Sequence, residues 1–329
     1  MKWFIIFLSL LLNSPGIYPE IAKATGKSMI DIEETQKRLR DHLEVLTLTI
    51  GERSVFSHEN LKKTAQYIES FYRDIGIPAR AEPYRYKDIT VANIVAEISF
   101  CQNPSTHYLL VAHYDSVANT VGADDNASAV AVQLETARLL KALKATEELD
   151  LAVAFVSFAL EEPPVFGTRY MGSKVYAKRA RKEGKDIDGV ICLEMVGYAC
   201  YDRGCQSYPF PLMFFGYPKE GNFIGIVADF SSRKFARSIS LHFRENRKLP
   251  VVKLTVPFGG WLVPAVRMSD HVSFWDEGYK AVMITDSAFY RNPHYHLSTD
   301  TMDRLDYHFM AELVESLLIF FRSHHPPST

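Results

Sequence analysis

Two kinds of hydrophobic pattern alternate along most of this chain. Segments in which apolar residues recur every three or four positions predict helices, and short continuous apolar runs predict strands buried on both faces. Their alternation predicts an α/β fold in three layers, with a central mixed, mostly parallel sheet flanked by helices. The expected helices cover residues 31–46, 59–72, 128–143, 167–182, 232–243 and 306–321, and the expected strands cover 91–98, 107–113, 151–160, 190–196, 223–227, 251–256 and 281–285.

The first residues have the pattern of an export signal. Lys2 precedes a largely apolar block, residues 3–12, which has the length of a signal-peptide core and is too short to span a bilayer. Pro15 and Pro19 argue against one continuous buried helix in this region. Residues 22–24 (Ala-Lys-Ala) fit a small-x-small cleavage site. We therefore expect removal of residues 1–24, export to the periplasm or the medium, and a single domain over residues 25–329.

Composition and charge exclude several classes of protein. Of the 329 residues, 47% are hydrophobic, which is enough for a large core and excludes a disordered chain. Lys and Arg total 37 and Asp and Glu total 39, so no basic excess is present to bind a nucleic-acid backbone. No apolar run reaches the roughly 20 residues of a membrane-spanning helix, so we expect no integral membrane segment.

The four cysteines do not have the spacing of a zinc site. Cys192 lies in an apolar run, as expected for a buried free thiol, whereas Cys200 and Cys205 are close enough to form a disulfide in an exported protein. These two cysteines begin a long irregular segment, residues 199–221, that is rich in aromatic residues and too apolar to be solvated. We expect this segment to form either the wall of a substrate cleft or a loop packed on its own side chains.

Two polar motifs follow the strand predicted at residues 107–113. His113 and Asp115 are two positions apart, so both side chains can point the same way, and a carboxylate beside a metal-bound imidazole is a common arrangement. Alone, this pair is more typical of a structural histidine. Residues 122–128 (GADDNAS) then open a helix. Helix capping explains one acid there, but it does not explain both Asp124 and Asp125.

Further acids and histidines lie at the ends of later predicted strands. Glu161 and Glu162 follow a buried strand and would need a cation nearby, although solvated loop acids are the alternative. Glu194 lies within a buried strand, where a lone carboxylate is costly unless it binds a metal, finds a partner or stays protonated. Tyr295 and His296 follow the last predicted strand, with His294 as a competing histidine.

These residues predict a metal centre at the carboxyl ends of the strands, where open α/β sheets form their binding crevice. Nitrogen and oxygen donors without cysteine suit Zn²⁺. The charge of one Zn²⁺ would not balance the three carboxylates and would leave the site negative, whereas two Zn²⁺ with a bridging hydroxide would make it neutral. We therefore expect two Zn²⁺ per chain. The candidate ligands are His113, Asp125, Glu162, Glu194 and His296.

In this order, the motifs HYD, GADDNAS, EE, LEM and YHxxxDT resemble those of the M28 zinc aminopeptidases. The resemblance implies an exported or vesicular exopeptidase with a zinc exopeptidase-like fold, a pair of zinc ions, and a peptide substrate with a free N-terminus. By position, His113, Asp125 and Glu194 would bind one ion. Asp125, Glu162 and His296 would bind the other, so that Asp125 bridges the pair.

The resemblance also implies roles for residues that do not bind metal. Glu161 would be the general base, Asp115 would support His113, and Tyr295 would help to stabilise the oxyanion. The likeness further implies an unusual peptide bond after Asp125. Two positions depart from the family pattern: Glu194 stands where many relatives have Asp, and Ala129 stands where the loop often has Gly.

Three alternatives remain open at the level of sequence. A glutaminyl cyclase on the same fold would use a single zinc ion and no water nucleophile. A carboxypeptidase would need a basic pocket, for which Arg203, Arg267 and Arg291 are the candidates. A metal-bound receptor or adhesion module would have no use for Glu161, a base without a ligand role. Asp270 and His271 are assigned no catalytic role, and the sequence does not indicate an oligomeric state.

Overall fold

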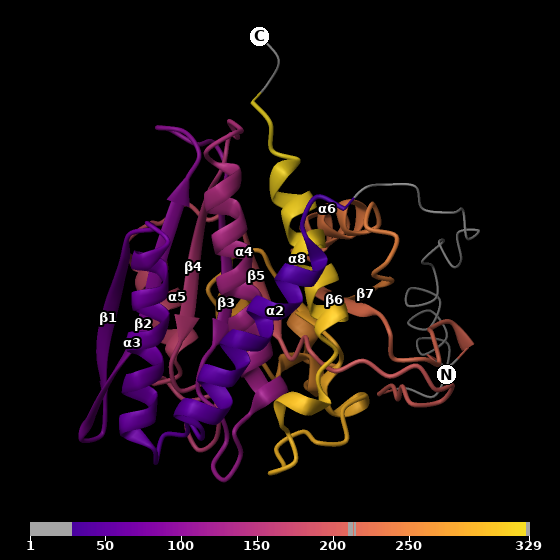
Figure 1. Ribbon diagram of the computed structural model, residues 1–329, viewed down its shortest axis with the longest axis horizontal. Coiled ribbons are helices and arrows are strands. Elements are labelled where there is room, and N and C mark those ends of the chain that lie inside the picture. The colour runs from indigo at the N-terminus through magenta and orange to yellow at the C-terminus, as the bar shows by residue number, and fades with distance from the viewer. Residues whose placement is uncertain (1–27, 210–212, 214, 327–329) are drawn as a thin grey trace.

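An eight-stranded mixed sheet forms the centre of the protein in a computed structural model that describes residues 28–209, 213 and 215–326 (Figure 1). The strand order is β1-β2-β4-β3-β5-β8-β6-β7. The four central strands are parallel to one another, whereas β2 runs antiparallel to β4 and β6 runs antiparallel to β8. The strands are β1 (Ala79–Tyr86), β2 (Ile89–Ser99), β3 (His107–His113), β4 (Ala152–Phe158), β5 (Gly189–Glu194), β6 (Ile224–Asp229), β7 (Val251–Val256) and β8 (Ala281–Thr285).

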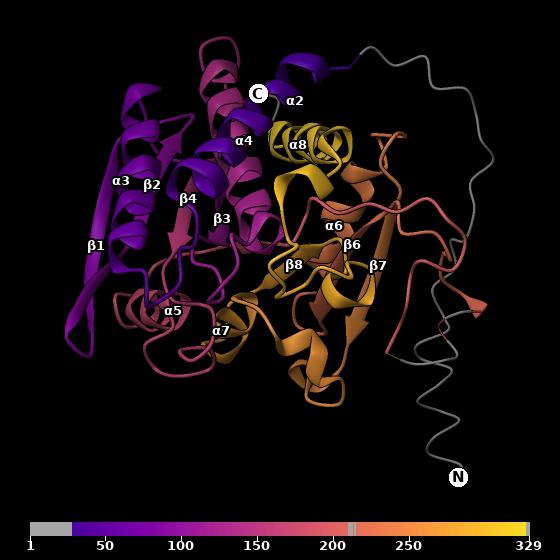
Figure 2. The same ribbon diagram turned by 60° about the horizontal axis from the view of Figure 1, so that its bottom comes forward.

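Helices cover both faces of the sheet, which confirms the three layers expected from the sequence. Figure 2 shows α2, α4 and α8 above the strands and α5 and α7 below them. Strand β3 shows why both faces are apolar. Leu110 and Ala112 belong to the larger apolar cluster, and Leu109 and Val111 belong to the cluster between the sheet and helices α5 and α7. The helices are α2 (Ile32–Leu43), α3 (His58–Asp74), α4 (Ala129–Leu143), α5 (Gly172–Lys182), α6 (Arg233–Phe243), α7 (His271–Asp276) and α8 (Tyr307–Arg322).

Two aspartates fix the starts of the first and last of these helices. The Glu34 N–H donates to the Asp31 side chain, and the Phe309 N–H donates to the Asp306 side chain, so each aspartate satisfies a free amide of the first turn. Helix α8 is buried along nearly its whole length because α2, α4 and α6 pack against it.

Several element boundaries differ from the prediction. The helix predicted over residues 31–46 ends at Leu43 and continues as a wider π-helical segment, Glu44–Ile50, which stops at Gly51 with φ of 85°. The helix predicted over residues 167–182 begins only at Gly172. The sequence analysis missed β1, because this edge strand contains charged residues and a proline and lacks the alternation of apolar and polar positions. It also missed the short helix α7.

The cysteines pair as expected. A disulfide joins Cys200 and Cys205, while Cys192 is a buried free thiol and Cys101 is an exposed one. The predicted signal peptide and the aromatic residues Phe210 and Phe214 lie outside the described residues. Within the described part of the chain, no helix is both long and apolar enough to cross a membrane.

Candidate metal centre

The carboxyl ends of the central parallel strands bring the predicted ligands together. His113 is the last residue of β3 and Glu194 is the last residue of β5, and these strands are neighbours in the sheet. Glu161 and Glu162 follow the end of β4, on the other side of β3. Parallel pairing therefore places residues that are distant in sequence at one edge of the sheet.

Two groups of three side chains are arranged to hold a metal ion, and they share one aspartate. In the first group, His113 Nε2 lies 3.5 Å from Asp125 Oδ1 and 3.5 Å from Glu194 Oε1. In the second, His296 Nε2 lies 3.2 Å from Asp125 Oδ2 and 3.3 Å from Glu162 Oε2. The two oxygens of Asp125 thus face different histidines, which is the arrangement expected of a bridging carboxylate.

Each group contains a ligand atom that lacks a hydrogen-bond partner and could bind a cation. His113 Nε2 and Glu162 Oε1 are buried without a hydrogen-bond partner among the described residues. Buried polar atoms are rarely left unpaired, so these two atoms need a ligand. Imidazole nitrogens and carboxylate oxygens without thiolates suit zinc.

The electrostatics of the centre also favour a cation. Burial raises the pKa of Glu162 to about 8, and the charge of Asp125 acts in the same direction. Burial lowers the pKa of His296, but hydrogen bonds to Asp125 and Glu162 outweigh it and raise this pKa to about 10. Three buried carboxylates and two imidazoles therefore cannot all adopt their ligand protonation states unless positive charge lies among them.

Asp115 supports both sides of the centre. Its Oδ1 lies 3.4 Å from His113 Nδ1, and its two oxygens accept the backbone N–H groups of Glu161 and Glu162, each at 3.0 Å. One carboxylate thus orients a candidate ligand on β3 and fixes the backbone of both glutamates after β4. The geometry agrees with the supporting position that the sequence analysis expected for Asp115.

Asp300 supports the shared ligand in the same way, and the sequence analysis gave it no role. Its oxygens accept the backbone N–H groups of Asp124 at 2.9 Å and Asp125 at 3.1 Å. The peptide bond between Asp125 and Asn126 is cis, which confirms the unusual bond expected there. The Asn126 side chain bonds to the backbone on both sides of Glu194, donating to Leu193 O and accepting from the Met195 N–H.

Arg53 is a second residue that the sequence analysis missed. Its guanidinium is fully buried and donates to the carbonyl oxygens of Tyr114, Val121 and Gly122, at 2.8, 2.6 and 2.9 Å. It also donates to Leu46 O and Gly51 O. Arg53 therefore joins the N-terminal helical segment to the two ends of the loop between Asp115 and the shared ligand.

Glu161 and Tyr295 lie at the centre without belonging to either ligand group. Glu161 Oε2 is 3.9 Å from His113 Nε2, and its side chain is buried. The Tyr295 ring stacks on the His296 ring with their centroids 3.7 Å apart. His294 bonds to Thr299 and is in neither group, so His296 is the histidine at the centre.

Residues 269–271 lie behind the centre. Ser269 Oγ donates to Glu194 Oε2 at 2.6 Å, a contact that no sequence signal indicated. Asp270 is buried, and burial raises its pKa to about 7. His271 donates to Val266 O, and burial lowers its pKa to about 3, so it is a neutral structural histidine. Neither Asp270 nor His271 belongs to a ligand group.

An apolar pocket opens beside Glu194. The irregular segment that the sequence analysis linked to a substrate cleft contributes residues 206–209, 213 and 217 to the pocket lining. Ala265, Val266 and Met268 form another part. Strands β6, β7 and β8 contribute Ile226, Leu254 and Met283, and Tyr295 lies at the end toward the metal ligands.

The three arginines that could bind a substrate carboxylate either bond to other parts of the protein or lie away from the pocket. Arg291 is buried and donates to Gln206, Tyr198 and Phe223. Arg267 donates to Asp276 and Gly259 and lies over the Trp261 ring. Arg203 is exposed in the disulfide loop and is not among the residues that line the pocket.

Comparisons with known proteins identify the family of this chain. Residues 93–320 match peptidase family M28, as the sequence motifs predicted. The Escherichia coli (strain K12) protein YfbL is 35% identical over 301 residues, which cover 87% of this chain and 86% of that protein. A probable leucine aminopeptidase of Trichophyton verrucosum is 23% identical over 239 residues, covering 69% of this chain and 56% of that longer protein.

Solved structures share the fold at low sequence identity. A zinc aminopeptidase from Bacillus subtilis has a TM-score of 0.68 and 14% identity, covering 91% of this chain and 98% of that one. A glutaminyl cyclase of Porphyromonas gingivalis has a TM-score of 0.62 and 16% identity, covering 89% and 98%. The fold alone thus accommodates both chemistries, whereas the sequence match is to a peptidase family. Because that match spans most of the chain and includes all five candidate ligands, the protein belongs to peptidase family M28.

Proposed function

We propose that this protein is an exported aminopeptidase that uses two zinc ions to release apolar residues from the N-termini of peptides. Membership of family M28 implies a zinc-dependent peptidase. The observation that carries the finer proposal is the pair of three-residue ligand groups that share Asp125, with Glu161 beside them and outside both.

The ligand roles follow from the two groups. His113, Asp125 and Glu194 would hold one ion, and Asp125, Glu162 and His296 would hold the other. When bound, such a metal pair polarises the scissile carbonyl and makes water a stronger nucleophile at neutral pH. Asp115 keeps His113 in the ligating tautomer, because its carboxylate faces Nδ1 and leaves Nε2 free to bind.

Glu161 carries the proton in this mechanism. It takes a proton from the attacking water and delivers it to the leaving amine, a role for which its position outside both ligand groups leaves its carboxylate free. Burial raises the pKa of the Tyr295 hydroxyl, which therefore stays protonated at neutral pH and can donate to the developing oxyanion.

The centre and the pocket together select the N-terminal end of a peptide. The free amino group lies among the carboxylates beside Glu194, and the first side chain enters the adjoining pocket, which is lined mainly by apolar residues. We infer that large apolar N-terminal residues such as leucine are preferred. We also propose that residues 1–24 are a signal peptide and that the residues after them form a single catalytic domain. Export would bring the enzyme to peptides outside the cell.

The remaining alternatives fit the site less well. A cyclase that needs one zinc ion gives no reason for two complete ligand groups. A carboxypeptidase needs a free cation beside the pocket, but Arg267 and Arg291 already donate to protein oxygens. A binding module without turnover gives no reason for the position of Glu161.

Metal content combined with substrate blocking tests the proposal. Purified enzyme would be stripped of metal, reconstituted with Zn²⁺ and assayed on leucine p-nitroanilide and its N-acetylated counterpart. We expect two zinc ions per chain and product from the unblocked substrate only. One zinc ion per chain with cyclisation of N-terminal glutaminyl peptides would establish the cyclase instead, and tight zinc binding without turnover would establish a binding module.

A further inference from the structure

One wall of the pocket beside the metal centre comes from the segment between β5 and β6, outside the strands of the sheet and the α-helices. The described part of this wall is residues 206–209, 213 and 215–217, and it contributes Gln206, Ser207 and Tyr217 to the pocket lining. At the base of the segment the backbone of Cys200 bridges to that of Gly221, and the N–H groups of Gly204 and Gln206 donate to Lys219 O. Side-chain hydrogen bonds add to these backbone contacts and help to hold the wall in position.

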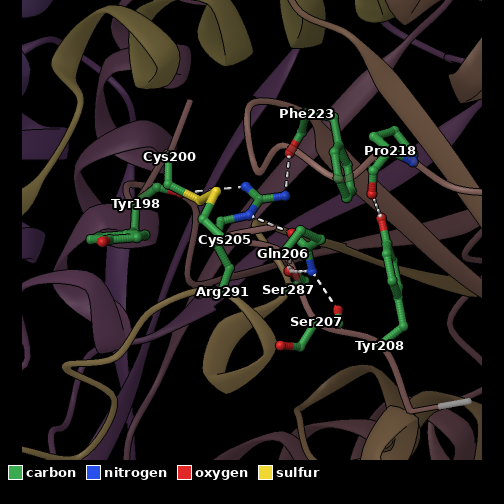
Figure 3. The surroundings of a disulfide bond; sticks show 10 residues. All are labelled: Tyr198, Cys200, Cys205, Gln206, Ser207, Tyr208, Pro218, Phe223, Ser287 and Arg291. Atoms are coloured by element: carbon green, nitrogen blue, oxygen red, sulfur yellow. Dashed lines mark hydrogen bonds between the residues drawn. A yellow bond between two sulfur atoms is a disulfide. The ribbon is translucent and has the colours of Figure 1, made fainter. Parts of the chain in front are cut away.

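The disulfide fixes the chain just before the wall. The bond between Cys200 and Cys205 closes a short loop, and Gln206 follows it directly (Figure 3). Packing at this point is tight: a Cβ atom at Gly221 would lie 2.5 Å from Cys200 Sγ and 2.7 Å from Arg291 Nε. The disulfide, the backbone of residue 221 and the Arg291 side chain thus form one closely packed group.

Arg291 joins the wall to both ends of the segment. Its Nε donates to Gln206 Oε1 at 2.8 Å, Nη1 donates to Tyr198 O at 3.3 Å, and Nη2 donates to Phe223 O at 2.9 Å. The guanidinium also lies 4.5 Å from the centroid of the Phe223 ring. Tyr198 precedes the disulfide loop and Phe223 leads into β6, so one buried cation spans the base of the segment.

Gln206 connects Arg291 to the opposite side of the pocket through hydrogen bonds. Its amide oxygen also accepts from Ser287 Oγ at 3.1 Å, and its amide nitrogen donates to Ser207 O at 2.8 Å. The Ser207 N–H donates to Tyr290 O at 2.7 Å. Residues 287–290 follow β8 and line the pocket themselves, so these bonds set the distance between two of its walls.

We propose that Arg291, together with the Cys200–Cys205 disulfide, is a positioning residue that determines side-chain specificity by holding the wall of the substrate pocket. This inference rests on the proposed function, because it takes the pocket as the site of the N-terminal side chain. Lysine cannot replace Arg291, since one ammonium group cannot donate to three acceptors that a planar guanidinium reaches together. None of the hydrogen bonds of Arg291 involves a candidate metal ligand, so its effect falls on substrate side chains and not on zinc.

The test compares large and small substrates in the zinc-loaded full chain. Wild-type hydrolysis of leucine p-nitroanilide establishes the proposed function first, and its absence would refute that function without bearing on the wall. In Arg291→Lys we expect KM for the leucine substrate to rise about tenfold or more. We expect KM for the alanine substrate and the zinc content to stay within twofold of wild type. Arg138→Lys, which alters an arginine paired with Glu135 on α4, is the matched control and should leave both KM values unchanged.

Reduction of the wild-type enzyme provides a second measurement that needs no variant to fold. Treatment with a phosphine reductant that leaves zinc bound should raise KM for leucine relative to alanine, in the same direction as Arg291→Lys. An equal fall in activity on both substrates, or loss of zinc from Arg291→Lys, would overturn the proposal. An unchanged leucine-to-alanine ratio after complete reduction would overturn the role of the disulfide.

Discussion

Replacing Asp115 by Asn tests whether one carboxylate organises the metal centre. Asp115 accepts two backbone N–H groups, from Glu161 and Glu162, and faces His113 Nδ1. Asparagine has nearly the same size, but it offers one oxygen and replaces the other by a donor. At least one of the three groups that Asp115 now faces must then lose its acceptor.

The magnitude follows from these contacts. A buried N–H group without an acceptor costs about 1–3 kcal/mol, which a domain with a stability of about 5–15 kcal/mol can lose and still fold. Removing the partner of a metal-bound histidine typically weakens metal affinity by about 10–100-fold. We therefore expect Asp115→Asn to fold, to bind zinc about 10–100-fold more weakly, and to lose activity even at saturating zinc because Glu161 is no longer held in place.

Competition with a chromogenic chelator measures the zinc affinity, and urea denaturation of the metal-free protein measures stability. Asp229→Asn is the matched control, because Asp229 is a buried carboxylate that accepts from Ser231 and from the Ser232 N–H, and it belongs to neither ligand group. It should lose stability without losing zinc affinity. Equal zinc affinity in Asp115→Asn and wild type would refute the reasoning, whatever the loss of stability.

Three further predictions concern single residues. Glu161→Gln should keep both zinc ions and lose about 10²–10⁴-fold in kcat, whereas Glu162→Gln should lose zinc; metal analysis showing the reverse would exchange their roles. Arg53→Lys should destabilise the protein by about 3 kcal/mol in urea denaturation, because a lysine leaves most of the buried carbonyl acceptors unpaired; a loss below about 1 kcal/mol would contradict this. Burial, aided by the charge of Arg38, lowers the pKa of His42 to about 4, so the unfolded chain takes up a proton there before the folded protein does. Stability should therefore fall by up to about 3 kcal/mol as the pH drops from about 6.5 to 4, and His42→Phe should reduce that slope in urea titrations at several pH values.

The ligands could be predicted from sequence because their positions are tied to strand ends. Glu194 stands out as a charge in an apolar run, and His113 ends another such run. Once the strands are parallel, their carboxyl ends lie along one edge, so identifying the strands places the ligands near one another. The resemblance to the M28 aminopeptidases then supplied the division of the candidate ligands into two groups, which composition and periodicity alone do not determine.

The supporting residues could not be predicted in the same way. Asp300 acts through hydrogen bonds to the backbone of Asp124 and Asp125, and backbone acceptors leave no pattern in the sequence. Strand β1 has too few apolar residues to be distinguished from a loop, because an edge strand needs only one partner and buries little. Ser269 is an ordinary serine until the fold brings it to Glu194.

Arg53 shows most clearly what tertiary structure adds. It lies outside residues 93–320, which match the peptidase family, yet it bonds to both ends of the loop that separates Asp115 from Asp125. Burial lowers its pKa to about 10, and the charges of Asp115 and Asp300 oppose that decrease, so the guanidinium remains protonated at neutral pH. A positive charge thus lies near the two carboxylates that support the candidate ligands, where it offsets part of their buried negative charge. Arg53 therefore supports the candidate metal centre electrostatically as well as through its hydrogen bonds to the backbone.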